Sequence, residues 1–237
     1  MARFEIIVKL LNKSLPGFGN KGDRLLDIGA GDVYVLGRLA ELYPDAAFTG
    51  IDTALSQGNC EEFNRKYPNM ILTREISELP KEPFRAVLLL DVIEHIEDDR
   101  GFMAGLFNMS QTEDAACIIT APAFNALFSL HDRFLGHQRR YSLAQLKSLA
   151  EHAGFDVVEG GYLFLSLLPV RGIQKIMEMA GIAKQHSNSV AAWKGYGRYD
   201  SLLVKLLLLD YALLSALRRV GINLPGLSSF VICKKQR

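Results

Sequence analysis

Apolar and polar positions alternate in two different ways along this chain. Short runs rich in Val, Ile and Leu, typical of buried strands, are separated by stretches in which apolar residues recur at helical spacing. The runs predict strands at 24–28, 47–51, 70–73, 86–90, 116–120, 155–162 and 229–234. The helical spacing predicts helices at 33–43, 55–67 and 99–109, with a turn-rich link at 75–83. This rhythm predicts an α/β fold with a doubly wound parallel sheet.

The simplest organisation is a single domain over residues 1–237, since neither a repeat nor a low-complexity segment interrupts the pattern. We expect residues 1–20 to form an N-terminal helical extension. It should lie on the surface, because the charged residues Glu5, Lys9 and Lys13 interrupt its apolar patches. Residues 163–225 predict a helical insertion before the final strand. Its second stretch, 200–221, contains Lys205 and Asp210, so it is too interrupted for an ordinary membrane span.

The face of the insertion leaves several interpretations open. At about 100° per residue, leucines 206, 213, 214 and 217 form one stripe with Asp210 in its middle. The stripe fits a helix that packs on the core or on a second copy in a homodimer. It also fits a lid, or a helix that docks on a membrane surface toward a lipid acceptor.

Charge and cysteine content narrow the functional classes. The net charge of +1 gives no electrostatic footprint for nucleic acid. The three cysteines are widely spaced, which suits neither a disulfide framework nor a zinc cluster. Together with an N-terminus that lacks a long apolar signal region, this predicts a reduced, cytoplasmic location.

The stretch LLDIGAGD, residues 25–32, places candidate chemistry at the end of the first strand. Gly29 and Gly31 permit a tight turn and close approach of a ligand. A dinucleotide fold normally has a third glycine where Asp32 stands, and an acid at that helix start would repel a phosphate. The site therefore favours a ligand without phosphates, and Asp27 adds negative potential that suits a cation.

Asp52 ends the second strand, about twenty residues beyond the glycine turn, where an acid can accept both hydroxyl hydrogens of a ribose. Alternatively, Asp52 has only a structural role, as a cap for the following helix. A nucleoside that carries positive charge and no phosphate describes S-adenosylmethionine. At this point the chain resembles the class I methyltransferases that use this cofactor, and the resemblance covers nearly the whole chain.

The resemblance implies a Rossmann-like, seven-stranded sheet that is mostly parallel, with an antiparallel final strand. It also implies the cofactor site: the first motif, the ribose acid, the adenine-lining REISELP and the segment after strand four in LLLDVIEHIEDD. The implied cofactor residues are Asp27, Gly29, Ala30, Gly31, Asp52, Thr53, Glu75, Ile76, Asp91 and Val92. Asp32 departs from the common pattern of this family near the methionine tail of the cofactor.

The run DVIEHIED, residues 91–98, raises the question of a metal. In a helix, Asp91, Glu94 and His95 would share a face and could hold a divalent ion. The run looks like that of quinone-biosynthesis O-methyltransferases, some of which are thought to use such an ion. Many metal-free relatives carry a similar Glu-His pair, so our prediction is no metal, with His95 contacting the substrate.

The loop after the fifth strand, residues 121–141, concentrates polar side chains where substrate-facing loops of this fold lie. It resembles a methyltransferase subfamily linked to sugar, quinone or lipid-linked intermediates. A hydroxyl acceptor must lose a proton, so His131 with Asp132, or His137, is the candidate base. Arg139, Arg140, Tyr141 and, from the insertion, Trp193 are candidate substrate contacts. The structural alternative is that the arginines pair with acids and that Trp193 is a packing anchor.

The sequence therefore predicts methyl transfer from S-adenosylmethionine to a small-molecule acceptor, with a hydroxyl of a sugar, quinone or lipid-linked intermediate as the target. Nucleic acid is not an expected partner, whereas membrane contact and a homodimer stay open. Two alternatives remain at this stage. One is a nicotinamide-dependent oxidoreductase, which Asp32 disfavours, and the other is a catalytically silent binding protein of the same fold.

Overall fold

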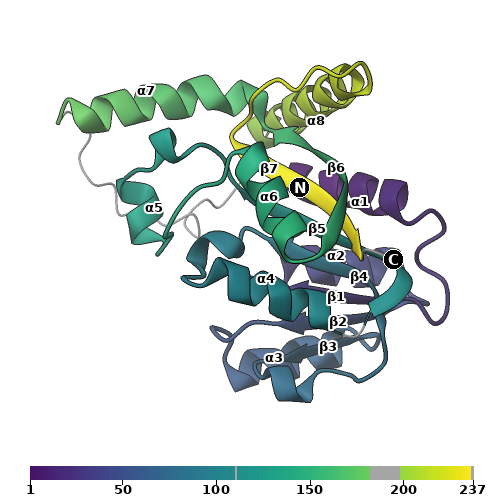
Figure 1. Ribbon diagram of the computed structural model, residues 1–237. Coiled ribbons are helices and arrows are strands. Elements are labelled where there is room, and N and C mark those ends of the chain that lie inside the picture. The colour runs from purple at the N-terminus through teal and green to yellow at the C-terminus, as the bar shows by residue number, and fades with distance from the viewer. Residues whose placement is uncertain (110, 182–197, 236–237) are drawn as a thin grey trace.

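The computed structural model describes residues 1–109, 111–181 and 198–235, and its strands form one sheet in the order β3-β2-β1-β4-β5-β7-β6 (Figure 1). The strands are β1 (Arg24–Ile28), β2 (Ala47–Ile51), β3 (Met70–Thr73), β4 (Phe84–Leu90), β5 (Gln111–Pro122), β6 (Phe155–Leu163) and β7 (Ser228–Lys235). Strands β1 to β5 are parallel to one another. The predicted fold class is therefore confirmed.

Strand β7 lies between β5 and β6 and is antiparallel to both. Its centre pairs Ile232 with Ile118 of β5, and on its other edge Val231 pairs with Gly160 of β6. A strand from the end of the described chain thus occupies an interior position of the sheet.

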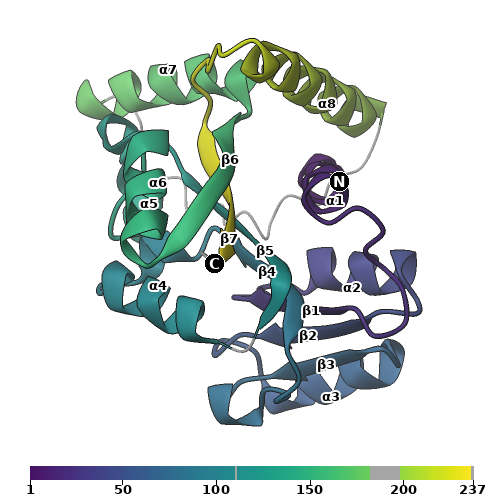
Figure 2. The same cartoon turned by 45° about the vertical axis from the view of Figure 1, so that its right-hand side comes forward.

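Helices cover both faces of the sheet (Figure 2). One face packs against α1 (Ala2–Ser14), α2 (Tyr34–Leu42), α3 (Gln57–Lys66) and α8 (Arg198–Arg219). The other packs against α4 (Asp99–Asn108) and α6 (Leu143–His152). Because both faces are covered, central residues such as Leu26, Val87 and Leu88 are fully buried, which explains the continuous apolar runs of these strands.

Helix α1 accounts for the predicted N-terminal extension and is more deeply packed than a surface helix needs to be. Ile6, Ile7, Leu10 and Leu11 have essentially no exposed surface. They recur at helical spacing and pack in the core cluster that also contains residues of α2 and α8. The first turn of α1 is thereby fixed beside the carboxyl ends of the strands.

The segment between β6 and β7 contains α7 (Leu168–Met179) and α8, which lie at the end of the molecule away from β3 (Figures 1 and 2). Asp210 of α8 is buried and accepts hydrogen bonds from the backbone nitrogen and the hydroxyl of Ser166, at 3.0 and 3.2 Å. The acid on the leucine stripe is therefore satisfied within the fold. Leu214 is buried, while Leu206 and Leu213 are about half exposed. Trp193 lies outside the described residues.

Candidate cofactor and acceptor site

The turn after β1 has the backbone that the glycines predict. Gly29 and Gly31 both have positive φ, at +74° and +56°. A Cβ atom on Gly29 would lie 2.4 Å from Cγ2 of Val92, so only glycine fits there. Ala30 is buried in the same turn, and Asp32 accepts a hydrogen bond from the backbone nitrogen of Tyr34 at 3.1 Å. Asp32 therefore binds the first backbone N–H of α2 from the position before the N-cap residue, Val33.

Asp27 is a buried carboxyl at the end of β1, with 3% of its surface exposed. Its Oδ1 atom has no hydrogen-bond partner among the described residues. Burial, with added repulsion from Asp52 and Asp32, raises the pKa of Asp27 to about 7. An acid in this state favours a ligand that brings a hydrogen-bond donor or a positive charge.

Asp52 lies directly after β2 and holds the turn in place. Its two carboxylate oxygens accept hydrogen bonds from the backbone nitrogens of Gly31 and Ala54, each at 2.8 Å. Thr53 follows on the surface, and its carbonyl oxygen accepts a hydrogen bond from Arg74 at 3.4 Å. The aspartate thus joins the first two strand ends, and each of its oxygens keeps a second lone pair for a ligand hydroxyl.

Glu75 and Ile76 lie beyond the end of β3, where the short 3-10 turn Ile76–Glu78 begins. Both are exposed, and Ile76 has 74% of its surface accessible. An apolar side chain this open, at the ligand-binding edge of the sheet, offers a flat contact for an aromatic ring.

Asp91 follows β4 in left-handed backbone, with φ of +55°. It forms an ion pair with Arg3 of α1 and accepts a hydrogen bond from the hydroxyl of Thr120 at 2.8 Å. Burial opposes the charge of Asp91, but Arg3 and Thr120 outweigh it and lower the pKa of this carboxyl. The N-terminal helix therefore reaches into the site.

The run DVIEHIED forms only the 3-10 turn Ile93–His95. Glu94 is fully buried, and within the described chain neither of its carboxylate oxygens has a hydrogen-bond partner. Burial, with repulsion from Asp91, raises the pKa of Glu94 to about 9. Its Oε1 atom lies 3.9 Å from Nε2 of His137. Burial and the neighbouring Asp91 thus favour the neutral form of the Glu94 carboxyl.

His95 and His137 meet edge to face, with ring centroids 4.7 Å apart. Burial and the charge of His137 lower the pKa of His95. Ligand atoms of Glu94, His95 and His137 all lie within 4.8 Å of one another, which matches the composition of a divalent-metal site. Asp91, the third member of the set considered from the sequence, is held by Arg3 instead. The expectation of no metal stays a prediction.

Asp132 lies on the short helix α5 (Leu130–Phe134) and is almost completely buried. It accepts hydrogen bonds from Nε and Nη2 of Arg140, at 2.9 and 3.1 Å, and from Nδ1 of His137 at 3.0 Å. Burial would raise the pKa of Asp132, but these donors and Ser129 hold it well below its usual range. Arg171 of α7 also reaches this carboxylate, at 3.2 Å.

The structure therefore separates the candidate bases. Asp132 contacts His137 and not its neighbour His131, which is half-buried on the same helix. Since a carboxylate can only accept, Nδ1 of His137 is the donor to Asp132, and Nε2 is the ring nitrogen left to exchange a proton with an acceptor. His137 lies together with Glu94 and His95, while Arg140 donates hydrogen bonds to the Asp132 carboxylate.

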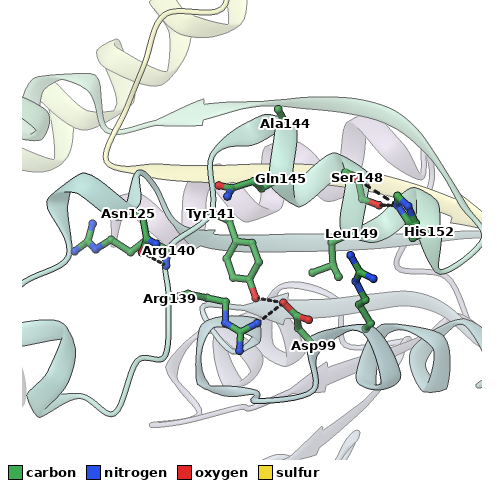
Figure 3. A pocket seen from close by; sticks show the side chains of 11 residues that line it. Asp99, Asn125, Arg139, Arg140, Tyr141, Ala144, Gln145, Ser148, Leu149 and His152 are labelled. Atoms are coloured by element: carbon green, nitrogen blue, oxygen red, sulfur yellow. Dashed lines mark hydrogen bonds and ion pairs between the residues drawn. The ribbon is translucent and has the colours of Figure 1, made fainter.

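Arg139 and Tyr141 line a pocket of about 490 Å³ between α4 and α6 (Figure 3). Both bind Asp99: Nη1 of Arg139 at 2.9 Å and the hydroxyl of Tyr141 at 2.7 Å. Burial and the Asp99 carboxylate raise the pKa of Tyr141. The two arginines predicted as substrate contacts are therefore engaged with acids, as the structural alternative expected, and their contact with substrate stays a prediction.

Sequence reasoning did not find Arg3 or Arg171. Arg3 stands in the first turn of a helix 88 positions before Asp91, and Arg171 follows Asp132 by 39 positions. No local pattern marks either one. The sequence indicated only that the two arginines stand in predicted helical segments, 1–20 and 163–225.

A family model described as a methyltransferase domain matches residues 2–160. The match therefore runs from the start of α1 into β6 and ends before α7 and α8. No curated protein sequence matches the chain.

Solved structures of the same fold cover almost the whole chain. A presumed sarcosine dimethylglycine methyltransferase from Galdieria sulphuraria has a TM-score of 0.61 at 12% identity, over 99% of this chain and 85% of that one. Coclaurine N-methyltransferase bound to N-methylheliamine and SAH has a TM-score of 0.58 at 15% identity, over 98% and 70%. A SAM-dependent methyltransferase from Archaeoglobus fulgidus has a TM-score of 0.54 at 18% identity, over 98% and 94%.

Proposed function

Because the chain belongs to the family of S-adenosylmethionine-dependent methyltransferase domains, we propose that it methylates a hydroxyl group of a small-molecule acceptor: a sugar, a quinone or a lipid-linked intermediate. The observation that supports a hydroxyl acceptor is the position of the His137 imidazole. Asp132 orients it through Nδ1, and Nε2 is left to take a proton. The family membership favours methyl transfer over the nicotinamide alternative.

The residues at the carboxyl ends of the first three strands fit the cofactor. Asp27 offers an orphaned carboxyl oxygen for its ammonium group, and Gly29 allows the backbone approach. Asp52 has lone pairs for the ribose, and Glu75 and Ile76 are open to the adenine. When bound, S-adenosylmethionine supplies a methyl group on a positively charged sulfur, already activated for transfer.

The chain's own contribution to chemistry is alignment of the acceptor and removal of its proton. His137 accepts that proton at Nε2, while the anionic Asp132 stabilises the imidazolium that forms. Glu94, with a pKa of about 9, is uncharged at pH 7 and does not repel the negative charge that develops on the acceptor oxygen. A neutral amine acceptor would have less need of such a base. The fold alone does not choose the acceptor atom, since coclaurine N-methyltransferase, named for a nitrogen acceptor, shares it.

The experiment offers methyl-labelled S-adenosylmethionine together with hydroxylated quinones, sugars and amines. We expect label on hydroxyl oxygen, and label found only on amines would refute the hydroxyl proposal. His137→Ala should lower kcat by about 10²–10⁴ at saturating acceptor, whereas His131→Ala should stay near the wild-type rate.

Two further readings sharpen this test. Both variants should bind S-adenosylhomocysteine as the wild type does, so that a loss of turnover is not a loss of cofactor. Excess EDTA should leave the rate unchanged. A rate abolished by EDTA and restored by one divalent ion would instead assign Glu94, His95 and His137 to a metal.

A further inference from the structure

Helix α7 presents an apolar face that the described fold leaves uncovered. Val170, Ile173, Ile176 and Met177 are all at least 41% exposed, and the helix has no buried residue. It is held instead by polar contacts, since Lys175 donates to the carbonyl oxygen of Phe128 at 2.5 Å. An amphipathic helix whose apolar side is turned outward needs another apolar phase to cover it.

Helix α8 lies at the same end of the molecule as α7 (Figure 2). Its inner side packs through Tyr211 and Leu214, which are buried. Its outer side carries an apolar stripe at helical spacing, with each member at least 48% exposed: Leu202, Leu206, Leu209, Leu213 and Val220. The exposed faces of α7 and α8 are called the apolar platform below.

The fully exposed charges among the described side chains of the platform are cationic. Among the described side chains of 168–181 and 201–222, the exposed charged residues are Lys205 and Arg219, both cationic. Of the two acids in these ranges, Asp210 is buried and bound to Ser166, and the partly exposed Glu178 accepts a hydrogen bond from the backbone nitrogen of Leu130 at 3.4 Å. A second copy seated symmetrically on this face would present the same exposed cations, while the described acids there are already buried or hydrogen-bonded within the fold.

We propose that the apolar platform docks this protein on an anionic lipid surface, with α7 and α8 lying in the membrane interface. Exposed apolar stripes flanked by lysine and arginine bind such surfaces through apolar burial and attraction to anionic headgroups. Within the described part of the chain, every helix is too short or too polar to cross a bilayer, so the contact is peripheral.

The platform is joined to the candidate acceptor site. Arg171 of α7 binds Asp132, the carboxylate that orients His137, and Lys175 holds the segment before α5. Phe134 on α5 is itself 58% exposed. Docking through α7 would therefore bring this loop close to the lipid surface. If the proposed function holds, the acceptor that reaches His137 is one carried by the membrane.

The test is co-sedimentation of the full chain with phosphatidylcholine vesicles, with and without phosphatidylglycerol, at low salt. The wild type should bind the anionic vesicles. Combining Ile173→Ser and Ile176→Ser with Leu206→Ser and Leu209→Ser should weaken binding at least tenfold. The matched control pair, Ile71→Ser and Val158→Ser, removes similarly exposed residues from β3 and β6 and should change nothing.

Lys205→Ala and Arg219→Ala should each weaken binding to anionic vesicles about fivefold and leave binding to neutral vesicles unchanged. Absence of vesicle binding by the folded wild type would overturn the proposal. So would a dimer, seen by light scattering, that the four serine substitutions dissociate while vesicle binding persists. Binding of S-adenosylhomocysteine, measured on the same preparations, is independent of the platform and separates this failure from a failure of the proposed function.

Discussion

The substitution Asp27→Asn should stabilise the protein at pH 8 and weaken its cofactor binding at the same time. Asp27 is buried, its Oδ1 atom is unpartnered, and two further acids lie close enough to repel its charge. Its pKa is raised from 3.8 to about 7, with burial as the largest cause. Asparagine has nearly the same shape and carries no charge at any pH.

The magnitude follows from proton linkage. Between pH 3.8 and about 7 the folded state keeps a proton that the unfolded chain has released. The free energy of unfolding therefore falls by about 1.4 kcal/mol per pH unit across that window, for a total of about 4 kcal/mol. This contribution of Asp27 to stability is fully present below pH 3.8, the pKa of the unfolded chain, and is lost above about pH 7, the pKa of the folded state.

Urea unfolding of the wild type and of Asp27→Asn at pH 5 and pH 8 measures this directly. The free energy of unfolding of the variant, relative to that of the wild type, should be about 3 kcal/mol higher at pH 8 than at pH 5. Calorimetry should show affinity for S-adenosylmethionine lowered by about tenfold to a hundredfold, the worth of a hydrogen bond to a charged group. Wild-type binding at pH 7 should release about half a proton, because the cofactor's ammonium group favours the carboxylate.

Two results would refute this reasoning. One is a difference in the free energy of unfolding between wild type and Asp27→Asn that is the same at pH 5 and pH 8. The other is a binding enthalpy at pH 7 that does not depend on the ionisation enthalpy of the buffer. Asp32→Asn, which removes an exposed charge from the same turn, is the control for affinity and should cause a much smaller loss.

Three further predictions address the turn and the acceptor loop. Asp132→Asn leaves the buried guanidinium of Arg140 without its anion and should lower the free energy of unfolding by about 3–5 kcal/mol. Because the pKa of Asp132 is held well below its usual range, urea titrations should give the same loss at pH 5 and pH 8. Gly29→Ala forces a methyl group against Val92 in left-handed backbone, and thermal unfolding should show a cost of about 2–5 kcal/mol. Asp52→Ala should lower S-adenosylhomocysteine affinity at least about tenfold by calorimetry, and retained affinity would contradict the ribose assignment.

The fold could be predicted closely where turn residues or caps flank an element. The bounds of β1, β2 and β3 coincide with the predicted ones, and β1, for example, ends at the turn that Gly29 begins. Strand β5 begins at Gln111, five positions before its predicted start. Its first residues, Gln111 to Asp114, are polar and partly or fully exposed, so backbone pairing and not burial extends the strand.

The site was only partly predictable, because its acceptor half is assembled from distant segments. The turn and the acids after β1 and β2 are marked by local spacing. By contrast, the partner of Asp132 is His137, five positions away across a loop, and Nε2 of His137 faces Glu94 from an entirely different element. Nothing in the sequence indicates that Arg3 pairs with Asp91. The apolar spacing of a helix predicts which of its residues are buried, but not which strand end the helix lies against.

The interior position of β7 has a consequence for synthesis on the ribosome. Strands β1 to β5 can pair as they emerge, but β5 keeps one edge open, and β6 has no neighbour, until residues beyond 228 appear. The pairing of Ala116 with Lys234 closes a loop of more than a hundred residues, which slows folding. Nascent chains that stall before β7 would therefore carry an unpaired apolar strand edge and depend on chaperones to avoid aggregation.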